Sequence, residues 1–518
     1  MESSSESSPA RGTGIAVSGV MLVIFLFAID GTIVGAAMPT IVGKLGGLEL
    51  YSWVFSTYML TSALATPLCG RLSDLYGRRR LMLIGIGLFT LASALCGMAQ
   101  SMEQLVVFRA VQGVGGGAIY ALSFIIVGFL FPPNKRAQMQ GLISGIWGVA
   151  SILGPLAGGV ITQYWSWRWI FFVNVPISLA ATLLIVSGLR ETEAVHRRRP
   201  DLKGAATLLV GLFLLFYALE ESRRNFFVLD WTLATLLLSA FVALALFYAF
   251  ERRSAEPILP PGLFRLRLFR ICAALSWLAS MGIFGVISYL PLYVQGVLGG
   301  SASRAGMALL LASLGWTAGS LISGQGMNRF GYRTTSVAGM LLMTLGYGLF
   351  VGSGNHLGLV VVLIVGCVIG AGMGIVSVTS MVAAQNSVPF NQLGVATSTV
   401  MLFRMFGGAF GISLMGSVLF SQMQRRLVTL SAGAGIDMPD GLIKKLANPQ
   451  NLLDPSTRAS IPDSLLASLV DILGYSIWYA FFSGFFIMLL GLALSFFMAD
   501  HTPAGAPPPS NPSATPTS

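Results

Sequence analysis

The chain has 518 residues, of which 55% are hydrophobic and only 10% are charged. An ordinary soluble domain carries roughly 25% charged residues, so this composition excludes a water-soluble enzyme. Fourteen spans of about 20 apolar residues would use roughly 280 positions, which is close to the hydrophobic share of the chain. The net charge of +11 is therefore expected to report membrane topology and not nucleic-acid binding. We expect an all-α polytopic membrane protein in a lipid bilayer.

Apolar runs, taken in chain order, predict fourteen membrane-spanning helices. Their approximate ranges are 15–38, 51–70, 81–100, 103–130, 141–163, 168–189, 203–220, 229–250, 271–296, 304–327, 334–353, 357–385, 394–420 and 475–498. The first run lacks the flanks of a cleavable signal peptide and is expected to be retained. The Ser-rich residues 1–14 and the Pro- and Ser-rich residues 501–518 are expected to be disordered tails.

The positive charges predict the orientation of the chain. An even number of spans places both tails on one side, and the short loops of that side hold most of the Lys and Arg residues. Short loops rich in Lys and Arg face the cytoplasm, whereas long loops escape this rule. Both termini are therefore expected in the cytoplasm and the long 421–474 loop outside, as a surface excursion or as a substrate gate. Compact loops and the lack of a targeting sequence favour a bacterial inner membrane.

One internal repeat predicts two halves. The sequence GRLSDLYGRR at 70–79 recurs as GQGMNRFGYR at 324–333, where Asn328 stands in place of Asp74. We expect six-helix halves at 15–190 and 266–500, with two linker helices inserted at 191–265. Small residues four apart predict close helix packing in both halves. They are Gly113, Gly117, Gly366, Gly370 and Gly374.

These motifs resemble the major facilitator superfamily, and in particular its fourteen-helix branch of drug:proton antiporters. The similarity covers roughly residues 15–420 and the last helix. It rests on GRLSDLYGRRR at 70–80, RAVQG at 109–113, GVASILGPLAGG at 148–159, DGTIVGAAMP at 30–39 and WRWIFFVNVP at 167–176. The resemblance implies a major facilitator fold and a proton-coupled exporter of small amphiphilic drugs that works by alternating access.

Asp30 is the only acidic residue deep within an expected span, and an ionisable group in a bilayer indicates function by default. Helix rise places it about 22 Å from the inner face, and it places Arg109 roughly 9 Å from the outer face of a core about 30 Å thick. The two residues are thus at the same depth and can pair if their helices are neighbours, as the resemblance implies. The pair is interpreted as a proton switch, and the alternative is a static ion pair that fixes helix packing.

The 70–80 motif supplies a candidate cytoplasmic gate. Gly70, Asp74, Gly77, Arg78 and Arg79 lie between the second and third expected helices. We expect Asp74 with Arg78 and Arg79 to form a charge latch that holds the halves together. The alternative is a solvated, positively charged loop. Because Asn328 replaces the acid in the second copy, we expect an asymmetric gate.

The 148–159 motif is expected to kink the fifth helix and bring a neighbour close. Its residues are Gly148, Gly154, Pro155, Gly158 and Gly159. Proline frees a carbonyl group, and glycines permit backbone approach. The physical pattern alone fits an ordinary packing kink, and only the resemblance makes it a marker of antiporters.

Arg404 lies about 15 Å into the thirteenth expected helix, and the sequence offers no acid between Glu256 and Asp437. It is interpreted equally as a cavity residue and as a structural hydrogen-bond anchor. Aromatic faces suit flat cations, although membrane aromatics also pack or anchor at interfaces. The candidate cavity residues are Tyr58, Trp147, Trp277, Tyr289, Tyr293 and Trp316.

Other chemistry is not expected. The three His residues are isolated and the four Cys residues have no ligand spacing, so neither a metal nor a disulfide is predicted. No Walker A motif is present, and no catalytic cluster indicates an enzyme or a cofactor. The alternatives are a dedicated exporter of a lipid, siderophore or other metabolite, an importer by proton symport, and a channel. The expected partners are a small-molecule substrate and protons, and an exporter of this kind has a periplasmic adaptor and an outer-membrane channel as candidate partners.

Overall fold

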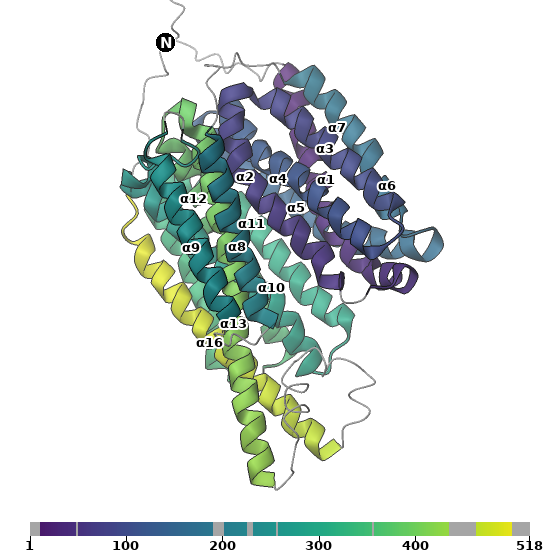
Figure 1. Cartoon of the computed structure of the whole chain (residues 1–518). Helices are drawn as coiled ribbons and strands as arrows, with labels where there is room; N and C mark the ends of the chain where they lie inside the picture. The colour runs from purple at the N-terminus through teal and green to yellow at the C-terminus, as the bar shows by residue number, and fades with distance from the viewer. Residues whose placement is uncertain are drawn as a thin grey trace, which may run out of the picture.

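The computed structural model of the chain describes residues 11–47, 50–189, 201–224, 231–254, 257–354, 357–434 and 463–499. Its regular elements in these ranges are all helices (Figure 1). The N-terminal half contains α1 (Arg11–Leu45), α2 (Tyr51–Tyr76), α3 (Arg78–Met98), α4 (Met102–Leu130), α5 (Pro133–Tyr164), α6 (Trp169–Phe172) and α7 (Asn174–Gly188). The all-α prediction is confirmed.

Two linker helices and a second half complete the chain. The linkers are α8 (Leu202–Arg224) and α9 (Trp231–Glu251), followed by the short η2 (Leu263–Arg265). The C-terminal half contains α10 (Arg267–Gly296), α11 (Ala302–Gly352), α12 (Leu359–Asn386), η3 (Phe390–Gln392), α13 (Leu393–Ala434) and α16 (Asp463–Ser495). Eleven of the described helices are long and apolar enough to cross a membrane. The multi-pass prediction is thus confirmed, and the count of fourteen spans stays a prediction.

Four of the fourteen expected spans explain the difference of three in number. Two of them are merged in α11, where they join at Gly331. α2 is not among the eleven because Ser and Thr residues lower its hydropathy, and the apolar part of α8 is short, covering Lys203–Ala218.

The repeat predicted from the sequence is visible in the backbone. Gly77 has φ 94° and ψ 141° between α2 and α3, and Gly331 has φ 79° and ψ 174° at the corresponding point of α11. A positive φ favours glycine because it has no Cβ atom. The same unusual backbone conformation therefore recurs 254 residues later, as expected for two related halves.

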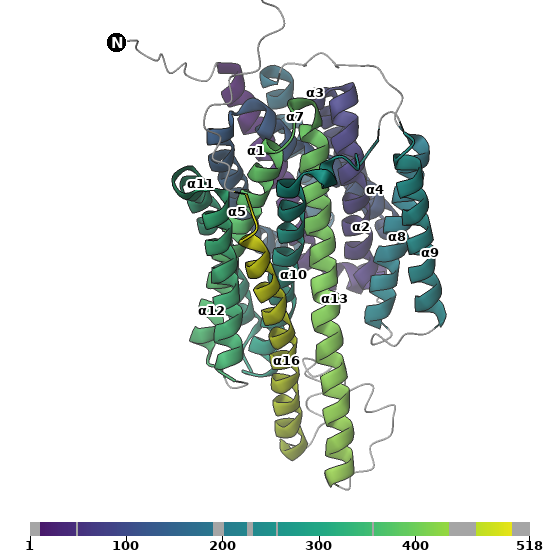
Figure 2. The same ribbon diagram turned by 90° about the vertical axis from the view of Figure 1, so that its left-hand side faces the viewer.

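Helices extend into two segments that were expected to lie outside the spans. α1 begins at Arg11, inside the expected tail of residues 1–14, while residues 1–10 and 500–518 lie outside the described ranges. Helix also occupies both ends of the expected loop at 421–474, because α13 continues to Ala434 and α16 begins at Asp463. Both helices extend beyond the rest of the bundle at the end opposite to the start of α1 (Figures 1 and 2). Residues 435–462 lie outside the described ranges.

Glycines allow the close helix contacts that the sequence predicts. A Cβ atom at Gly113 of α4 would lie 2.5 Å from the carbonyl oxygen of Tyr58 in α2. A Cβ atom at Gly370 of α12 would lie 2.0 Å from the carbonyl oxygen of Ala312 in α11. The second and fourth helices of each half therefore pack backbone against backbone.

The linker helices lie against a seam between the halves. α8 contacts both α2 and α13, and α9 packs on α8 (Figure 2). Phe216 of α8 lies against Phe406 of α13, with ring centroids 4.6 Å apart, and Tyr217 lies 6.2 Å from Trp53 of α2. On the opposite seam α5 packs directly against α11.

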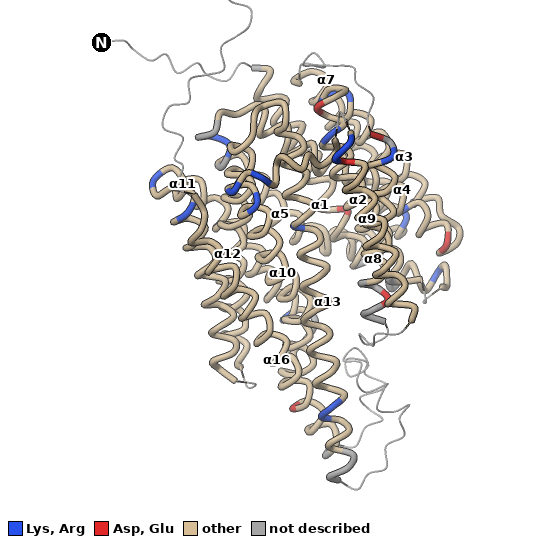
Figure 3. Tube along the Cα trace, turned by 60° about the vertical axis from the view of Figure 1, so that its left-hand side comes forward, with Lys and Arg blue, Asp and Glu red and all other residues tan. Residues whose placement is uncertain are grey.

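Lys and Arg residues gather around the end of the bundle where α1 begins (Figure 3). We call this end the basic end. It also contains the turn between α2 and α3 and the first residues of α5, α10 and α13. Its assignment to the cytoplasm, like that of the termini, stays a prediction.

Candidate functional site

Asp30 lies at the centre of a buried polar cluster in the N-terminal half. It is fully buried in α1, and its Oδ2 atom accepts a hydrogen bond from Arg109 Nη1 of α4 at 2.6 Å. Arg109 is 1% exposed. The ion pair expected from helix depth is therefore present, and its role in proton coupling stays a prediction.

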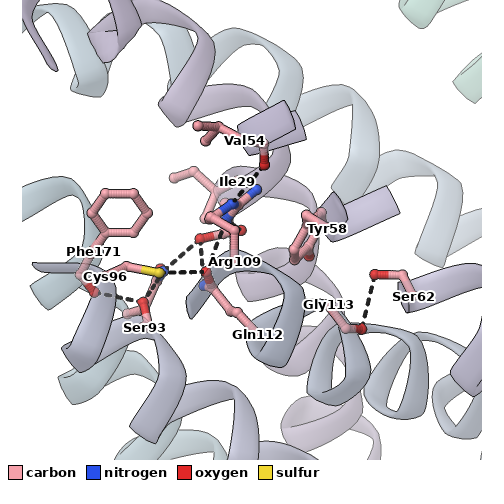
Figure 4. Close-up of polar contacts among 12 residues, drawn as sticks. Ile29, Val54, Tyr58, Ser62, Ser93, Cys96, Arg109, Gln112, Gly113 and Phe171 are labelled. Carbon is pink, nitrogen blue, oxygen red and sulfur yellow. Dashed lines mark hydrogen bonds and ion pairs between the residues drawn. The ribbon is translucent and has the colours of Figure 1, made fainter. Parts of the chain in front are cut away.

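Two amide side chains complete the coordination of Asp30. Gln112 Nε2 and Asn174 Nδ2 each donate to Asp30 Oδ1 at 2.9 Å. Gln112 Oε1 in turn accepts from Arg109 Nη1 at 2.9 Å, and Asn174 Nδ2 also donates to Ser93 Oγ at 3.0 Å. Figure 4 shows Ser93 of α3 close to Arg109 and Gln112 of α4 in this cluster.

The sequence analysis missed Gln112, Asn174 and Ser93. Each is a polar residue inside an apolar helix, which is a weak signal because such residues often only satisfy local backbone groups. Gln112 lies three residues after Arg109, on the same helix face. That spacing could have identified it.

Arg109 also connects the polar cluster to a group of aromatic side chains. Its guanidinium carbon lies 4.0 Å from the centre of the Tyr58 ring. Tyr58 packs on Phe27, and Phe27 contacts Trp147 with ring centroids 5.8 Å apart. Tyr120 stacks on Phe27 at 4.8 Å. We call Phe27, Tyr58, Tyr120 and Trp147 the aromatic cluster. Two of the candidate cavity residues thus lie together, one ring away from the ion pair.

The other candidate cavity residues lie apart from this cluster. Trp277 of α10 lies 5.8 Å from Phe410 of α13, and Tyr289 donates to the carbonyl of Ile412 at 2.6 Å. The Tyr293 hydroxyl accepts from the backbone N–H of Leu357 at 2.8 Å. Trp316 packs at the contact of α11 with α12, where its carbonyl lies 2.1 Å from an ideal Cβ at Gly374. These contacts join helices of the C-terminal half.

Arg404 is 7% exposed in α13 and donates from Nη2 to the carbonyl oxygen of Ser377 in α12 at 3.1 Å. Its Nε atom has no hydrogen-bond partner among the described residues. The structure therefore shows a backbone anchor, and the second reading as a cavity residue stays open.

Asp74 joins the two halves at the basic end. Its Oδ2 atom accepts from the backbone N–H of Val395, in the first turn of α13, at 3.3 Å, and its Oδ1 atom pairs with Arg78 Nη2 at 3.2 Å. The N-terminus of a helix offers free N–H groups to a negative charge. Burial raises the pKa of Asp74 to about 6, against the lowering effect of the nearby Arg78 and Arg71 guanidinium groups.

Two glycines allow α2, with its Asp74, to pack closely against α13. A Cβ atom at Gly70 would lie 2.1 Å from Ser398 Oγ, and one at Gly394 would lie 2.5 Å from Asp74 Oδ2. Arg78 covers the Phe129 ring at 4.3 Å and the Phe390 ring at 5.5 Å, so it contacts both halves.

Contrary to the expectation, Arg79 does not take part in the contact between the halves. Its Nη2 atom donates to the carbonyl oxygen of Val186 at 2.9 Å, near the C-terminal end of α7. A positive charge is favourable at that end of a helix. Arg79 therefore stabilises the N-terminal half alone.

A second set of contacts between the halves is neutral on the C-terminal side. Arg136 Nη1 of α5 donates to Asn386 Oδ1 of α12 at 2.6 Å, and Gln140 Nε2 donates to Gln385 Oε1 at 3.0 Å. Asn386 Nδ2 donates in turn to the Tyr332 hydroxyl at 2.8 Å. The contacts thus differ on the two sides of the basic end, and the asymmetric gate expected from Asn328 stays a prediction.

The 148–159 motif contacts both halves. A Cβ atom at Gly154 would lie 1.9 Å from Thr32 Oγ1 of α1, and one at Gly148 would lie 2.7 Å from Thr317 Oγ1 of α11. Thr32 Oγ1 also donates to the carbonyl of Ala150 at 3.1 Å. α5 continues as a helix through Pro155 to Tyr164.

The end of this motif is looser than expected. The carbonyl of Gly158 accepts from the hydroxyl of Thr162 within the same helix. No heavy atom lies within 4 Å of an ideal Cβ at Gly159. The expectation that Gly159 permits a close approach is therefore wrong.

Within the described ranges there is no group of three or more His, Cys, Asp or Glu residues that could hold a metal ion. The polar cluster around Asp30 contains one acid and one base that hold each other, which suits a change of protonation more than bond chemistry.

Comparison with known proteins identifies the family. The profile of the Major Facilitator Superfamily matches residues 20–412. The chain belongs to this superfamily. It is therefore a multi-pass membrane transporter of small molecules and not an enzyme.

Two relatives from Bacillus subtilis (strain 168) match almost the whole chain. Multidrug transporter protein MdtP is 34% identical over 508 residues, covering 95% of this chain and 93% of the relative. Multidrug resistance protein 3 is 33% identical over 491 residues, covering 94% and 95%. The resemblance stated from the sequence motifs is confirmed at the level of the superfamily.

Solved structures confirm the fold. The human organic anion transporter MFSD10 (TETRAN) matches with a TM-score of 0.63 at 17% identity, covering 93% of this chain and 99% of that one. FucP in its outward conformation matches with a TM-score of 0.59 at 14% identity, covering 95% and 100%.

Proposed function

We propose that this transporter exports small amphiphilic drugs or toxic compounds in exchange for protons. The observation that carries the proposal is the buried Asp30–Arg109 pair, whose arginine stacks directly on Tyr58 of the aromatic cluster. The names of the two B. subtilis relatives, a multidrug transporter and a multidrug resistance protein, support drugs as the substrate class.

Asp30 carries the proton in this proposal. In the present conformation its carboxylate accepts hydrogen bonds from Arg109, Gln112 and Asn174. Protonation removes the negative charge and leaves Arg109 buried without a counter-charge, which is costly in a low-dielectric interior. Arg109 and the Tyr58 ring beneath it then shift, and the aromatic cluster changes its shape. A proton and a substrate are thereby coupled through direct contacts.

The contacts at the basic end supply the second conformational element. Asp74 of α2 binds to α13, and Arg136 of α5 binds to α12, so these two residues hold the halves together there. With that end in the cytoplasm, as the charge distribution favours, the conformation is closed to the inside. Alternating access requires these contacts to break when the transporter opens inward.

Transport into proteoliposomes tests the proposal. Purified protein is given an imposed pH gradient and a panel of cationic, neutral and anionic amphiphiles of similar size. We expect accumulation of cationic or neutral compounds that depends on the gradient in the wild type and is lost in Asp30→Asn. Accumulation in Asp30→Asn with the same dependence on the gradient contradicts the proposed proton site.

A dedicated exporter of an anionic or zwitterionic metabolite is the second candidate. It is favoured by Arg404, whose buried guanidinium pairs with a carbonyl oxygen and with no acid in the described residues. In the same assay, transport of anionic members alone, lost in Arg404→Gln, would select this function. The adaptor and outer-membrane channel stay predictions, since the comparisons name transporters and no partner proteins.

A further inference from the structure

A cavity lies at the seam occupied by the linker helices. Its volume is about 510 Å³, and its walls come from α8, α9, α10, α13 and the segment before α10. The walls are apolar and include Leu212, Phe247, Trp277 and Phe406. Asp30, in contrast, is contacted from α1, α4 and α7. This lateral pocket is therefore distinct from the polar cluster of the N-terminal half.

One acid, Glu251, lines the lateral pocket. It is the last residue of α9 and is only 2% exposed. Its Oε1 atom accepts from the backbone N–H of Leu259 at 2.7 Å, whereas Oε2 has no hydrogen-bond partner among the described residues. A buried acceptor without a donor is unfavourable by about 1–3 kcal/mol, and by more when it is charged. The pocket thus contains an acceptor that lacks a donor.

A second carboxylate lies beside Glu251. An ideal Cβ at Gly204 of α8 would lie 2.8 Å from Asp201 Oδ2 and 3.0 Å from Glu251 Oε2, so both carboxylates face the same glycine. The positive group that acts electrostatically on Glu251 is Arg71 of α2, which also acts on Asp74. One guanidinium thus acts on two acids.

The lateral pocket is covered next to Glu251 and exposed at Tyr248. Leu259, Pro261 and Phe264 cover the end next to Glu251. Tyr248 lies on the rim and is 55% exposed. The pocket is therefore reached from the surface of the bundle that faces the bilayer. The Arg252 guanidinium lies 5.9 Å from the Tyr248 ring, and Arg252 is not part of the lining.

We propose that the lateral pocket binds a protonated amphiphilic amine, whose ammonium N–H groups donate to Glu251 and whose apolar body lies among the aromatic and leucine side chains. The volume is within the range of about 300–1,000 Å³ that is typical of small-molecule sites. Glu251 is itself one of the residues that line the pocket, so its carboxylate is the acidic group next to a bound amine. The same chemistry is offered by a soluble amine and by the headgroup of an aminolipid. The site does not depend on the proposed export function.

Photolabelling of the purified protein in phosphatidylcholine nanodiscs tests the site. The probe is dodecylamine with a diazirine at the end of its chain, and the matched probe is its N-trimethyl form, which has no N–H group to donate. We expect dodecylamine to label peptides of α8 and α13 in a saturable way, at lower concentration than the trimethyl form. Equal labelling by both probes overturns the proposal.

Three variants assign the label to the pocket. Glu251→Gln removes a charge-assisted hydrogen bond, and we expect it to weaken labelling about tenfold or more. Leu212→Trp fills the pocket and is expected to abolish labelling. The matched control, Leu237→Trp, adds the same side chain at a position of α9 that is 39% exposed and is not part of the lining. Labelling of Glu251→Gln or Leu212→Trp at the wild-type level overturns the proposal.

Two further arms separate the lipid from the proton site. Replacing phosphatidylcholine by phosphatidylethanolamine reduces labelling where the aminolipid is the natural ligand and leaves it unchanged where a soluble amine is, and both results support an amine site. Asp30→Asn is expected to keep the label on α8 and α13 even though it loses proton-coupled export. Loss of this label in Asp30→Asn contradicts a site distinct from the polar cluster.

Discussion

At the scale of single residues, the carboxylate of Asp30 has three donors in a fully buried position. Two of the donors are neutral amides, and their hydrogen bonds to Asp30 do not depend on its charge attraction to Arg109. Arg109 has additional support, because its Nε atom donates to the carbonyl of Val54 at 3.4 Å and its guanidinium stacks on Tyr58. The pair can thus lose its charge attraction without losing all of its contacts.

We predict that removing one member of this pair destabilises the protein more than removing both. Arg109→Gln leaves a buried carboxylate without its counter-charge, which is expected to cost about 3–5 kcal/mol. The double variant Asp30→Asn with Arg109→Gln is expected to recover most of this loss. Thermal unfolding in detergent measures the difference. Equal destabilisation by the single and double variants contradicts a charge pair in the folded protein.

The ion pair could be predicted from the sequence, but its amide partners could not. An acid alone in an apolar span is a strong signal, and helix rise fixes its depth. Gln112 and Asn174 carry no charge, and their side chains reach Asp30 only because α4 and α7 pack beside α1. The same limit applies to Arg79, whose partner is a carbonyl group of α7. Partners that depend on tertiary packing cannot be read from one helix.

A second prediction concerns two glycines of the 148–159 motif. Gly154→Ala places a Cβ atom 1.9 Å from Thr32 Oγ1, two residues from Asp30, whereas Gly159→Ala meets no atom within 4 Å. Overpacking of this kind costs about 1–3 kcal/mol. We expect Gly154→Ala to lower the unfolding temperature and the transport rate, and Gly159→Ala to match the wild type in both. Equal effects of the two variants contradict the assigned contact.

At the scale of helices, α5 and α2 each contact the C-terminal half through a glycine. α5 touches α1 at Gly154 and α11 at Gly148, and α2 touches α13 at Gly70. Each contact uses a glycine where a neighbouring backbone or hydroxyl group approaches. Small residues at these positions allow two rigid surfaces to meet and separate. The glycine pattern could be predicted from the sequence, whereas the identity of each neighbour required the fold.

We predict that Gly70→Ala opens the contact between α2 and α13. The new Cβ atom would lie 2.9 Å from the carbonyl oxygen of Gly394, which cannot move as a flexible side chain would. In a variant without native cysteines, Val395→Cys reports on opening, because Val395 is fully buried. We expect maleimide to label this cysteine at least several times faster in Gly70→Ala.

Gly87→Ala is the matched control for this experiment, because an ideal Cβ at Gly87 in α3 meets no heavy atom within 4 Å. It is expected to keep the labelling rate of the parent. An unchanged rate in Gly70→Ala, or an equal increase in both variants, contradicts the assignment of Gly70 to the contact between the halves.

At the scale of the whole molecule, the two halves hold together at the basic end through two sets of hydrogen bonds. In one set Asp74 accepts from the backbone of α13, and in the other Arg136 and Gln140 donate to neutral side chains of α12. The fold class and the division into halves followed from the repeat and the hydropathy. The extensions of α13 and α16 did not, because residues 421–434 and 463–474 have polar residues that lower their hydropathy without preventing helix formation. Hydropathy predicts burial in a membrane and not the full length of a helix.

The closed conformation is predicted to respond to acid through Asp74, which lies beyond the expected span of α2. Its pKa is about 6 where it is buried against α13, and exposure on opening returns the pKa toward an ordinary value of about 4. The closed form therefore binds the proton more tightly. The stabilisation is full below about pH 4, is lost as the pH rises to about 6, and does not change above that value.

Labelling of the cysteine reporter at position 395 measures this dependence. We expect the rate to increase between about pH 4 and 6, after correction for the intrinsic reactivity of the thiol with a free cysteine peptide. Asp74→Asn is expected to remove the pH dependence, because it has no proton to exchange. A pH dependence that persists in Asp74→Asn excludes Asp74 as its source.

The central claim is that substrate and proton compete through Asp30, and proton release on substrate binding tests it most directly. Purified protein in weakly buffered detergent solution is mixed with a transported amphiphile while a pH dye is followed, first with wild type and then with Asp30→Asn. The account predicts saturable acidification in the wild type and none in Asp30→Asn at equal substrate occupancy. Equal acidification by both proteins, or none by a wild type that demonstrably binds the substrate, would contradict it.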